Sequence, residues 1–323
     1  MKEKRMFKRI FTILGVFFLA LASLATDIKN APTKIKISES VKKEFGLKYE
    51  TVNVQVPGIK KNYSFLWISD LHVIAPDISE VAPKSQEVMA YRRDKRFNNP
   101  ISGKNPAALW AKLPNILNTS GADAVFFGGD ICDMGSVANL KVLKDGMKKI
   151  TIPFIFTRED HDITPWHLAS KDMTKQYQIS KEIDGHKKLH VLELEDLIVV
   201  GLDYSNRRIA PKVLKEFKAI YAKNKPMIIV MHVPIYPKGT KQPLKWITTK
   251  RSMWGNPRLK PKEVMGEFLN LISTSKGPVK VILSGHNHNT WDGYLALGTR
   301  HHIFGPAFEG TIGVINVFSE PTK

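Results

Sequence analysis

The 323-residue sequence has a single cysteine, Cys132, and it has neither an internal repeat nor a low-complexity segment. One cysteine excludes an intrachain disulfide, so the folded domain must be held by its core, helped by any metal that it binds. Acidic residues are also scarce, because 30 Asp and Glu stand against 49 Lys and Arg, which gives a formal charge of +19. Such an excess favours anionic partners: phosphorylated substrates, nucleic acid, polyphosphate or acidic membrane surfaces.

The first 25 residues have the parts of a secretory signal peptide. Five basic residues precede an apolar run at 10–25, and the small residues Ser23 and Ala25 favour cleavage after Ala25. The run is slightly short for a membrane span, which needs roughly 17–25 residues, so an uncleaved signal anchor is the alternative. Cys132 lies far from this region, which excludes a lipoprotein. We therefore expect an extracytoplasmic protein, secreted or periplasmic, or one held to the membrane by this segment.

The rest of the chain is expected to form a polar, lysine-rich lead-in at 26–48 and one domain at 49–323. Val52, Val54 and Val56 alternate with polar residues, as in a half-buried strand. Apolar runs that indicate strands follow at 63–69, 122–128, 152–157, 197–202, 227–231 and 279–284. Helix-like stretches at 107–117 and 211–223 lie between some of them. Strands that alternate with helices predict an α/β architecture with sheets covered by helices.

Residues 73–106 interrupt this rhythm with a polar insertion that is rich in Pro and Asn. It holds the basic cluster Tyr-Arg-Arg-Asp-Lys-Arg at 91–96. A long irregular insertion in a compact domain is usually functional or disordered. Two interpretations stay open: a solvated basic loop, or a lid that faces the substrate through Arg92, Arg93 and Arg96.

Aspartate and histidine follow five of the apolar runs at the point where each run ends. In open α/β sheets, ligands bind beyond the carboxyl ends of the strands, so these side chains are expected at one site. His286 and His288 also lie two residues apart, and in extended backbone such residues point the same way. The residues concerned are Asp70 and His72; Asp130 and Asp133; Asp160, His161 and Asp162; His232; and His286 and His288.

These residues are too many for one metal ion. A mixture of carboxylates and imidazoles suits Mn, Fe or Zn better than Ca or Mg, which prefer shells of oxygen alone. Two such ions about 3.5–4 Å apart would polarise a phosphoryl group, lower the pKa of a bridging water and stabilise both the attacking and the leaving oxygen. The pattern therefore predicts two divalent transition-metal ions and the hydrolysis of a phosphoester.

The ordered motifs Asp-Leu-His at 70–72, Gly-Asp-Ile-Cys-Asp at 129–133, Glu-Asp-His-Asp at 159–162, His232 before Val-Pro, and Gly-His-Asn-His at 285–288 resemble the calcineurin-like metallophosphoesterases. The resemblance covers roughly residues 49–317. It implies a four-layer α-β-β-α sandwich, in which two packed mixed sheets are flanked by helices, and a dinuclear metal centre. In that centre one metal would be held by Asp70, His72, Asp130 and His288, and the second by Asp130, Asp160, His232 and His286.

The resemblance also implies that His161 protonates the leaving oxygen or stabilises the transition state, with Asp133 orienting its ring. Asp162 is interpreted as structural, an acceptor behind the ligands. Cys132 is expected to be a small buried filler. The remaining histidines are predicted at the surface or in turns, with a supporting role behind the ligands as the alternative for the last two: His167, His186, His190, His301 and His302.

Two departures from the family pattern bear on function. Glu159-Asp160 stands where the family usually has Gly-Asn, which suggests a changed backbone or a crowded site. With Asp70, Asp130 and Asp160 ionised, two divalent ions would leave a charge of +1 instead of +2, which predicts tighter metal binding and a weaker attraction for phosphate. Met134 stands where the protein Ser/Thr phosphatases of the superfamily carry Arg, which argues against that branch.

We therefore expect an exported metal-dependent phosphoesterase that is most similar to the bacterial membrane-associated phosphodiesterases and favours diesters over monoesters. The expected substrate is a phosphorylated small molecule, a nucleotide or a lipid headgroup, with an anionic membrane surface as a further partner. Nucleic acid is less favoured, and no obligate protein partner is expected. The alternative hypothesis is a catalytically weakened member that binds anionic surface polymers or nucleic acid through the insertion. Its association would be salt-sensitive.

Overall fold

The structure is a computed structural model, and it describes residues 31, 33–203, 209–235 and 263–319. The predicted signal segment, residues 1–25, lies outside the described residues. Within them, no helix is both long enough and apolar enough to cross a membrane. Part of the predicted lead-in packs on the domain, because Ile35, Ile37 and Phe45 are buried and helix α2 (Glu39–Phe45) ends at Phe45.

The first sheet is mixed and has five strands. Strand β1 shows the alternation expected at its inward-facing valines, since Val52 and Val54 are buried. Strands β2, β3 and β4 run parallel to one another, whereas β11 pairs in parallel with β1 and antiparallel with β2. In spatial order, the strands are β1 (Lys48–Gln55), β11 (Thr311–Phe318), β2 (Tyr63–Ile68), β3 (Ala124–Phe127) and β4 (Phe154–Phe156).

The second sheet is also mixed and has six strands. Strands β6, β7 and β8 are parallel, and β8 also pairs in parallel with β10. The edge strands β5 and β9 run antiparallel to their neighbours. In spatial order, the strands are β5 (Leu189–Glu193), β6 (Ile198–Leu202), β7 (Met227–Val230), β8 (Val279–Ser284), β10 (Arg300–Ile303) and β9 (Trp291–Tyr294). All six predicted apolar runs are therefore confirmed as strands.

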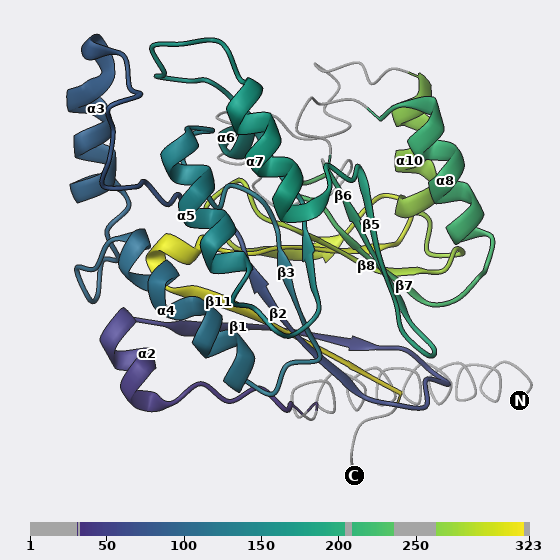
Figure 1. Ribbon diagram of the computed structural model, residues 1–323. Helices are drawn as coiled ribbons and strands as arrows, with labels where there is room; N and C mark the ends of the chain where they lie inside the picture. Colours follow the sequence, from purple (N-terminus) through teal and green to yellow (C-terminus); the bar gives the residue numbers. More distant parts are fainter. Residues whose placement is uncertain (1–30, 32, 204–208, 236–262, 320–323) are drawn as a thin grey trace, which may run out of the picture.

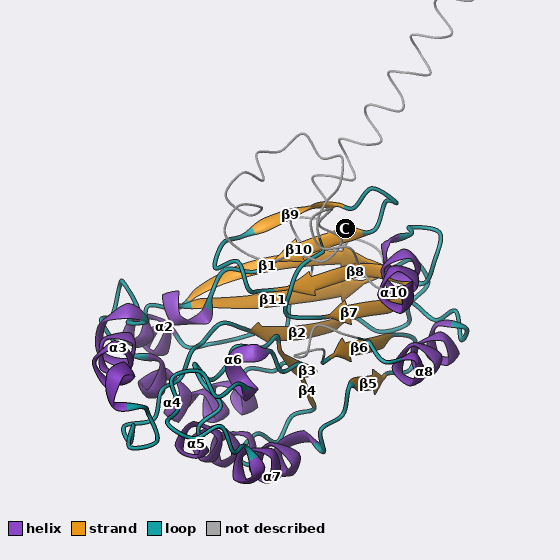
Figure 2. Ribbon diagram, turned by 90° about the horizontal axis from the view of Figure 1, so that it is seen from above, coloured by secondary structure: helices purple, strands orange, loops and turns teal. Residues whose placement is uncertain are grey.

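Three hydrophobic cores separate four layers, so the predicted α-β-β-α sandwich is confirmed. The middle core lies between the two sheets and includes Phe65, Phe126 and Val281. Helices α4, α5 and α7 lie on one side of the sheets, and α8 and α10 lie on the other (Figures 1 and 2). The helices are α4 (Pro106–Thr119), α5 (Val137–Met147), α7 (Thr174–Asp184), α8 (Pro211–Tyr221) and α10 (Glu263–Ser273).

The insertion at 73–106 is more ordered than its composition predicts. It contains the 3-10 turn η2 (Pro83–Ser85), helix α3 (Gln86–Tyr91) and the π-helical turn η3 (Arg92–Arg96). Met89 is fully buried in a small core beside the metal-binding loops, and Phe97 is 3% exposed. The expectation of an irregular loop is therefore wrong, because apolar side chains at both ends of the basic cluster bury themselves against the domain.

Candidate metal centre

The candidate ligands lie in the loops that follow parallel strands of both sheets. Asp70 comes two residues after β2, Asp130 three residues after β3, and Asp160 four residues after β4, where it begins the short helix α6 (Asp160–Ile163). His232 follows β7, and His286 and His288 follow β8 in the other sheet. The carboxyl ends of parallel strands in both sheets thus deliver their side chains to one place, as expected for an α/β protein.

All seven predicted ligands belong to groups of side chains close enough to hold a metal ion. The ligand atoms lie within 4.8 Å of one another in each of four groups among the described residues. One of these comprises His72, Asp133 and His161, and the other three together contain all seven predicted ligands. The first comprises Asp70, His72 and His288, the second Asp130, His232 and His286, and the third Asp130, Asp160 and His161. Asp130 belongs to the two groups that contain the other ligands predicted for the second ion, and its Oδ2 lies 4.0 Å from Nε2 of His72, a ligand predicted for the first. Its position between two ions stays a prediction.

Pairs of imidazole nitrogens face each other across both halves of the centre. His72 Nε2 lies 3.2 Å from His288 Nε2, and His232 Nε2 lies 3.2 Å from His286 Nδ1. Two nitrogen atoms that bind the same ion, each at about 2.0–2.1 Å, lie roughly 3.0–3.4 Å from each other. Asp130 Oδ1 is buried without a hydrogen-bond partner among the described residues. These residues fit two divalent cations, and a mixed set of nitrogen and oxygen donors favours transition metals.

The backbone is strained where the ligands are attached. Among the described residues, eight non-glycine residues have a positive φ, and five of them are candidate ligands with φ between 52° and 71°. Such left-handed positions cost about 1–3 kcal/mol each and gather at functional sites. They turn the chain sharply after each strand, which is why neighbouring side chains converge. The five residues are Asp70, His72, Asp130, His286 and His288.

Two glycines make room for the ligands. Gly129 has φ +90°, and a Cβ there would lie 2.8 Å from Nδ1 of His232. A Cβ at Gly285 would lie 2.4 Å from Oδ2 of Asp70. Because His232 and Asp70 belong to opposite sheets, these two glycines allow the sheets to approach each other at the site.

The electrostatics keep the carboxylates ionised. Burial would raise the pKa of Asp70, but His232 and His288 outweigh it and hold that pKa well below its usual range. Burial likewise opposes ionisation of Asp130, whose pKa is lowered mainly by His232 and His161. In turn, Asp130 and Asp70 overcome burial and raise the pKa of His232. Metal binding must therefore displace protons from histidine, and metal affinity should fall with falling pH.

Asp162 has the structural role predicted for it. Its carboxylate accepts hydrogen bonds from the backbone N–H groups of Asp130 and Cys132, at 2.9 Å each, and of Glu159, at 3.1 Å. Burial and the neighbouring Asp130 raise the pKa of Asp162 to about 7. Cys132 is fully buried, as predicted, and burial raises the pKa of its thiol.

The backbone at Glu159 shows no left-handed strain, and a change relative to the Gly of the family stays a prediction. Its φ of −133° is extended and open to any residue. Its side chain is 1% exposed, so a fourth carboxylate is buried next to the ligand Asp160, and it contributes to the raised pKa of His232. The substitution therefore adds a buried carboxylate to the site.

His161 contacts Asp133 as predicted. Its Nδ1 lies 2.9 Å from the backbone oxygen of Asp133 and 3.2 Å from the carboxylate Oδ1. With Nδ1 donating to Asp133, Nε2 is left for a substrate. Burial disfavours the imidazolium, but Asp130 and Asp133 outweigh it and raise the pKa of His161 to about 9. The ring is therefore protonated near neutral pH in the metal-free protein.

The insertion supplies two contacts that motif analysis missed. Arg92 binds Asp133 through two hydrogen bonds of 2.6 Å, and Asp133 also contacts Nδ1 of His72 at 2.9 Å. Phe97 stacks on the His72 ring, with 4.4 Å between centroids and 5° between planes. Asp133 thus joins both histidines to the insertion. In the sequence, these two contacts of Arg92 and Phe97 are indicated only by the presence of an aromatic residue next to the basic cluster.

The three arginines proposed to contact substrate have different surroundings. Arg92 is engaged by Asp133, Arg93 forms an ion pair with Asp94 at 2.8 Å, and Arg96 is exposed. Their contact with substrate stays a prediction, but Arg92 now has a second role, in positioning Asp133.

Replacing Arg92 with methionine is expected to lower both Mn²⁺ affinity and kcat by about 10- to 100-fold, the usual effect of losing a partner of a metal-binding or catalytic histidine. The reason is that Asp133 would lose its two charge-assisted bonds and hold His72 and His161 less firmly. Titration calorimetry with Mn²⁺ and steady-state kinetics test this. The Lys95→Met variant, at an exposed position of the same turn, is the control, and equal behaviour of the two variants would contradict the positioning role.

Three of the five remaining histidines contradict the prediction of surface or turn positions. His190, His301 and His302 are buried, on strands β5 and β10. His302 Nε2 lies 2.6 Å from Glu50 Oε1, which explains how a polar ring is accommodated there. Burial lowers the pKa of His301 to about 3. His167 and His186 are partly exposed in turns, as predicted.

Comparison with known proteins agrees with this geometry. The sequence model of the calcineurin-like phosphoesterases matches residues 63–290. No curated protein matches the chain. Similar solved structures include a dimetal phosphatase from Danio rerio, with 14% identity, 76% of this chain and 88% of that chain covered, and a TM-score of 0.46. A purple acid phosphatase from yellow lupin (Lupinus luteus) seeds has 12% identity, 80% and 46% coverage, and a TM-score of 0.47.

A phosphopantetheinyl hydrolase from Mycobacterium tuberculosis has 10% identity, 78% and 92% coverage, and a TM-score of 0.38. All three TM-scores lie below 0.5, so the family assignment rests on the match of the sequence, which spans more than half of the chain. The ordered motifs at five strand ends meet at one candidate metal centre, and the family model matches the residues that carry them. The chain therefore belongs to the calcineurin-like phosphoesterase family.

Proposed function

We propose that this protein is an exported metal-dependent phosphoesterase that hydrolyses phosphodiesters in preference to monoesters. The observation that carries the proposal is the gathering of all seven candidate ligands into groups whose ligand atoms are close enough to hold a metal ion, one of which also contains His161. Divalent ions bound there would polarise the phosphoryl group and supply an activated water. The export part rests on residues 1–25 and is tested by fractionating cells that express the full-length chain.

The chain's own residues supply a proton and position the group that donates it. His161 belongs to the group of Asp130 and Asp160, so its ring lies beside the place where the phosphoryl group would bind. Because its Nδ1 is fixed on Asp133, the ring presents Nε2–H to the leaving oxygen. Asp133 is itself held by Arg92. Protonation of the leaving oxygen by such a placed group contributes typically 10²–10⁴-fold.

The charge of the site supports diesters over monoesters. A phosphodiester carries one negative charge, whereas a phosphomonoester carries nearly two at neutral pH. The ionised Asp70, Asp130 and Asp160 would leave only one net positive charge with two divalent ions, and the carboxylate of Glu159 is buried beside them. Trp166 adds an exposed aromatic surface next to His161, with 4.8 Å between ring centroids, where the second ester group can pack.

Replacing Asp160 with asparagine is expected to weaken Mn²⁺ binding about tenfold, or about 1.4 kcal/mol, and to raise the monoester-to-diester rate ratio by a similar factor. One negative charge is removed while the side-chain shape is kept. Metal content after dialysis, together with kcat/KM for p-nitrophenyl phosphate and bis-p-nitrophenyl phosphate, measures both effects. Unchanged metal content and an unchanged ratio would contradict the charge argument.

The decisive experiment is hydrolysis of bis-p-nitrophenyl phosphate by the purified full-length chain. The protein is chelated and then resupplied with Mn²⁺, Fe²⁺ or Zn²⁺, with a variant of a candidate metal ligand, Asp130→Ala, in parallel. Turnover that returns with metal, and that the variant lacks, would support the enzyme. A folded protein that stays inactive with all three metals would favour the alternative of a binding module.

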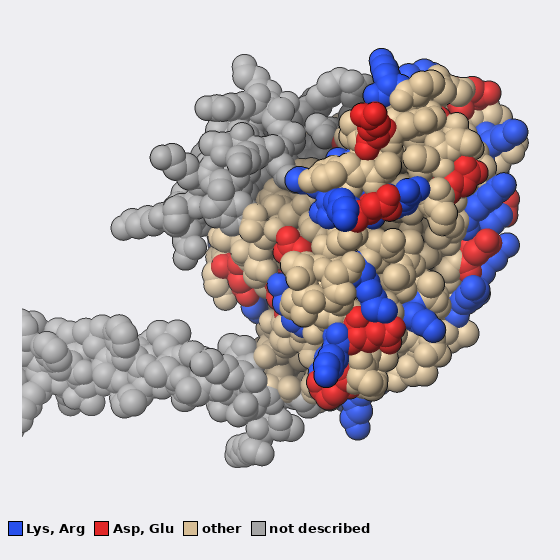
Figure 3. All heavy atoms as spheres, turned by 90° about the vertical axis from the view of Figure 1, so that its left-hand side faces the viewer, with Lys and Arg blue, Asp and Glu red and all other residues tan. Residues whose placement is uncertain are grey.

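The surroundings of the basic cluster favour the enzyme over that alternative. Arg92 and Arg93 are both engaged in ion pairs, with Asp133 and Asp94. On the face that carries α2 and α3, Lys and Arg side chains are interspersed with acidic ones rather than gathered into one patch (Figure 3). A polyanion would find few unpaired cations in this cluster. Salt-sensitive binding of a polyanion that is lost on neutralising Arg92, Arg93 and Arg96 would reverse this preference.

A further inference from the structure

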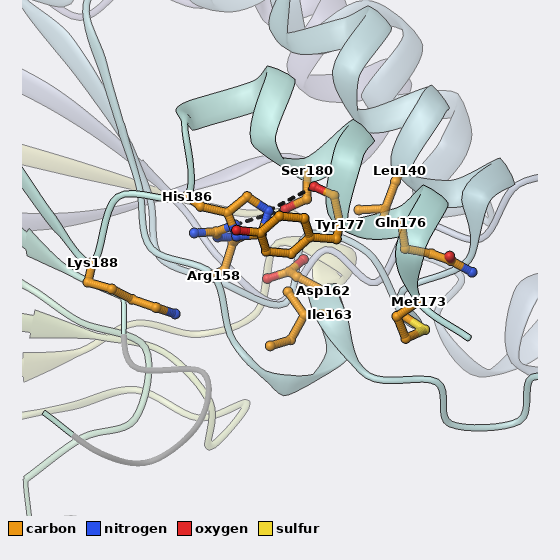
Figure 4. A pocket seen from close by; sticks show the side chains of 10 residues that line it. All are labelled: Leu140, Arg158, Asp162, Ile163, Met173, Gln176, Tyr177, Ser180, His186 and Lys188. Atoms are coloured by element: carbon orange, nitrogen blue, oxygen red, sulfur yellow. Dashed lines mark hydrogen bonds between the residues drawn. The ribbon is translucent and has the colours of Figure 1, made fainter. Parts of the chain in front are cut away.

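Ion pairs join the two sheets at both ends of the sandwich. At the end where β4, β5 and β6 lie, Arg158 binds Ser180 of α7 at 2.8 Å and Asp203, which directly follows β6, at 2.9 Å. Arg158 and Ser180 line a cavity of about 340 Å³ (Figure 4). At the other end lies a second cluster, which comprises Glu50 of β1, Asp292 of β9, and Arg300 and His302 of β10. The first cluster fixes the segment that leads into Asp160, whereas the second lies outside all the ordered motifs.

The second cluster holds the carboxylate of Glu50 in one orientation. His302 is 3% exposed, and its Nε2 lies 2.6 Å from Oε1 of Glu50, while its Nδ1 lies 3.4 Å from Oδ2 of Asp292. Arg300 donates to Asp292 at 3.0 Å. Burial disfavours the imidazolium of His302, but Asp292 and Glu50 outweigh it and raise the pKa of that ring. Two carboxylates thus face two cations when His302 is protonated, and the contact with His302 fixes Oε1 of Glu50.

The other oxygen of Glu50 accepts hydrogen bonds from two loops. Oγ1 of Thr290 donates to Oε2 at 2.9 Å, and the backbone N–H of Gly305 donates to it at 3.1 Å. A Cβ at Gly305 would lie 3.4 Å from both Oε2 of Glu50 and Oγ1 of Thr290, so the carboxylate and the two loops meet closely. Hydrogen bonds to a carboxylate are stronger than those between neutral groups. One oxygen of Glu50 thus joins both loops to strand β1.

The first of these loops carries a candidate metal ligand close to its contact with Glu50. Thr290 lies two residues after His288 and directly before β9. His286 lies at the other end of the loop, two residues after β8. The contact at Thr290 therefore bears on His288 more directly than on His286.

The second loop packs against the same ligand. It runs from Gly305 to Phe308, whose ring lies 5.1 Å from that of His288, with 78° between the planes. The backbone N–H of Phe308 donates to the backbone oxygen of Asp70 at 3.3 Å. Glu50 therefore holds both the loop that carries His288 and the loop that packs on its ring.

We propose that Glu50 is a positioning residue for the metal-binding group of Asp70, His72 and His288. Because it fixes both loops before a metal binds, less ordering is needed to bring His288 into place, and an ion in this group is held more tightly. An ion in the group that contains His286 depends on Glu50 much less, since His286 lies at the far end of the loop. The inference rests on the candidate metal centre and not on the proposed hydrolysis.

The test is calorimetric titration of Mn²⁺ into the full-length protein after its metal has been removed. His288→Ala and His286→Ala, which each remove one candidate ligand, assign the two binding steps. Glu50→Gln should weaken by about tenfold the step that His288→Ala weakens, and should leave the other step within about twofold of the wild type. Glu216→Gln, at an exposed position on α8, is the control and should bind like the wild type.

Thr290 offers a matched pair of variants at an exposed position. Thr290→Val removes the hydroxyl donor but keeps the shape of the side chain, and it should weaken the same step by about threefold, as expected for one hydrogen bond. Thr290→Ser keeps the donor and should bind like the wild type. A general loss of stability would not separate the two variants. The pair also serves as the test if Glu50→Gln does not fold.

Three results would overturn the inference: Glu50→Gln that binds Mn²⁺ like the wild type, Glu50→Gln that weakens both steps equally, or Thr290→Val and Thr290→Ser that bind alike. Wild-type protein that binds no Mn²⁺ would overturn it together with the candidate metal centre. Wild-type protein that binds Mn²⁺ in two steps but hydrolyses no phosphoester would contradict the proposed function alone.

Discussion

Replacing His161 with asparagine is expected to lower kcat for a phosphodiester by about 10²–10⁴-fold while leaving the bound metal unchanged. Asparagine keeps a donor that can reach Asp133 but cannot pass a proton to the leaving oxygen. The predicted metal ligands do not include His161, so metal content should stay constant. The size of the loss follows from the role of His161 as the acid, with its Nδ1 fixed at 2.9 Å from the backbone oxygen of Asp133.

The choice of substrate sharpens this test. A p-nitrophenolate leaves readily without a proton, whereas an alkoxide does not, so the variant should lose more activity on an alkyl diester than on bis-p-nitrophenyl phosphate. A merely structural change would lower both rates equally. His167→Asn is the matched control, because His167 is a partly exposed turn histidine with φ 64°, a conformation that asparagine tolerates. Loss of metal from the His161 variant, or equal losses on both substrates, would argue against the acid role.

The raised pKa of His161 adds a pH signature in the metal-free protein. Its value of about 9 lies above the unperturbed value near 6.5, so the folded state holds the proton more tightly than the unfolded chain. The resulting stabilisation is fully present below about pH 6.5 and is lost as the pH rises through 9. Between pH 6 and pH 9.5, the unfolding free energy of the chelated wild-type protein should therefore fall by up to about 3 kcal/mol more than that of the His161→Asn variant. Urea unfolding at both pH values measures the difference.

The meeting of the candidate ligands at one place could be predicted because a strand end is visible in sequence. Buried parallel strands appear as continuous apolar runs, and their carboxyl ends meet at one edge of the sheet. Asp70, Asp130 and His232 needed no more than that rule. The turns that aim them were not visible, because left-handed φ values at aspartate and histidine have no sequence signal comparable to glycine.

Contacts between distant segments could not be predicted. Arg92 and Phe97 reach the centre only because the insertion folds into helical turns. Arg92 contacts Asp133, which is distant in the sequence, and Phe97 contacts His72, which lies in another loop. Strand β11 was missed as a separate element although all eight of its residues are buried. Its place between β1 and β2 joins the end of the chain to its beginning, which no local pattern reports.

Replacing Asp162 with alanine is expected to destabilise the protein by about 3–6 kcal/mol, a large part of the 5–15 kcal/mol typical of a folded domain. Its carboxylate serves the backbone N–H groups of Asp130, Cys132 and Glu159, and each unpaired buried donor costs about 1–3 kcal/mol. Urea unfolding of the chelated protein at pH 8 gives the value, free of any contribution from metal binding.

The carboxylate geometry predicts a graded series. Oδ2 of Asp162 accepts from Asp130 and Glu159, whereas Oδ1 accepts from Cys132 alone. Asparagine can therefore place its one oxygen so as to keep two of the three bonds, and it should lose less stability than alanine. Asp145→Ala, at an exposed position on α5, should stay within about 0.5 kcal/mol of the wild type. A loss below 1 kcal/mol for Asp162→Ala, or an asparagine variant less stable than the alanine variant, would show that the loops are held by something other than this carboxylate.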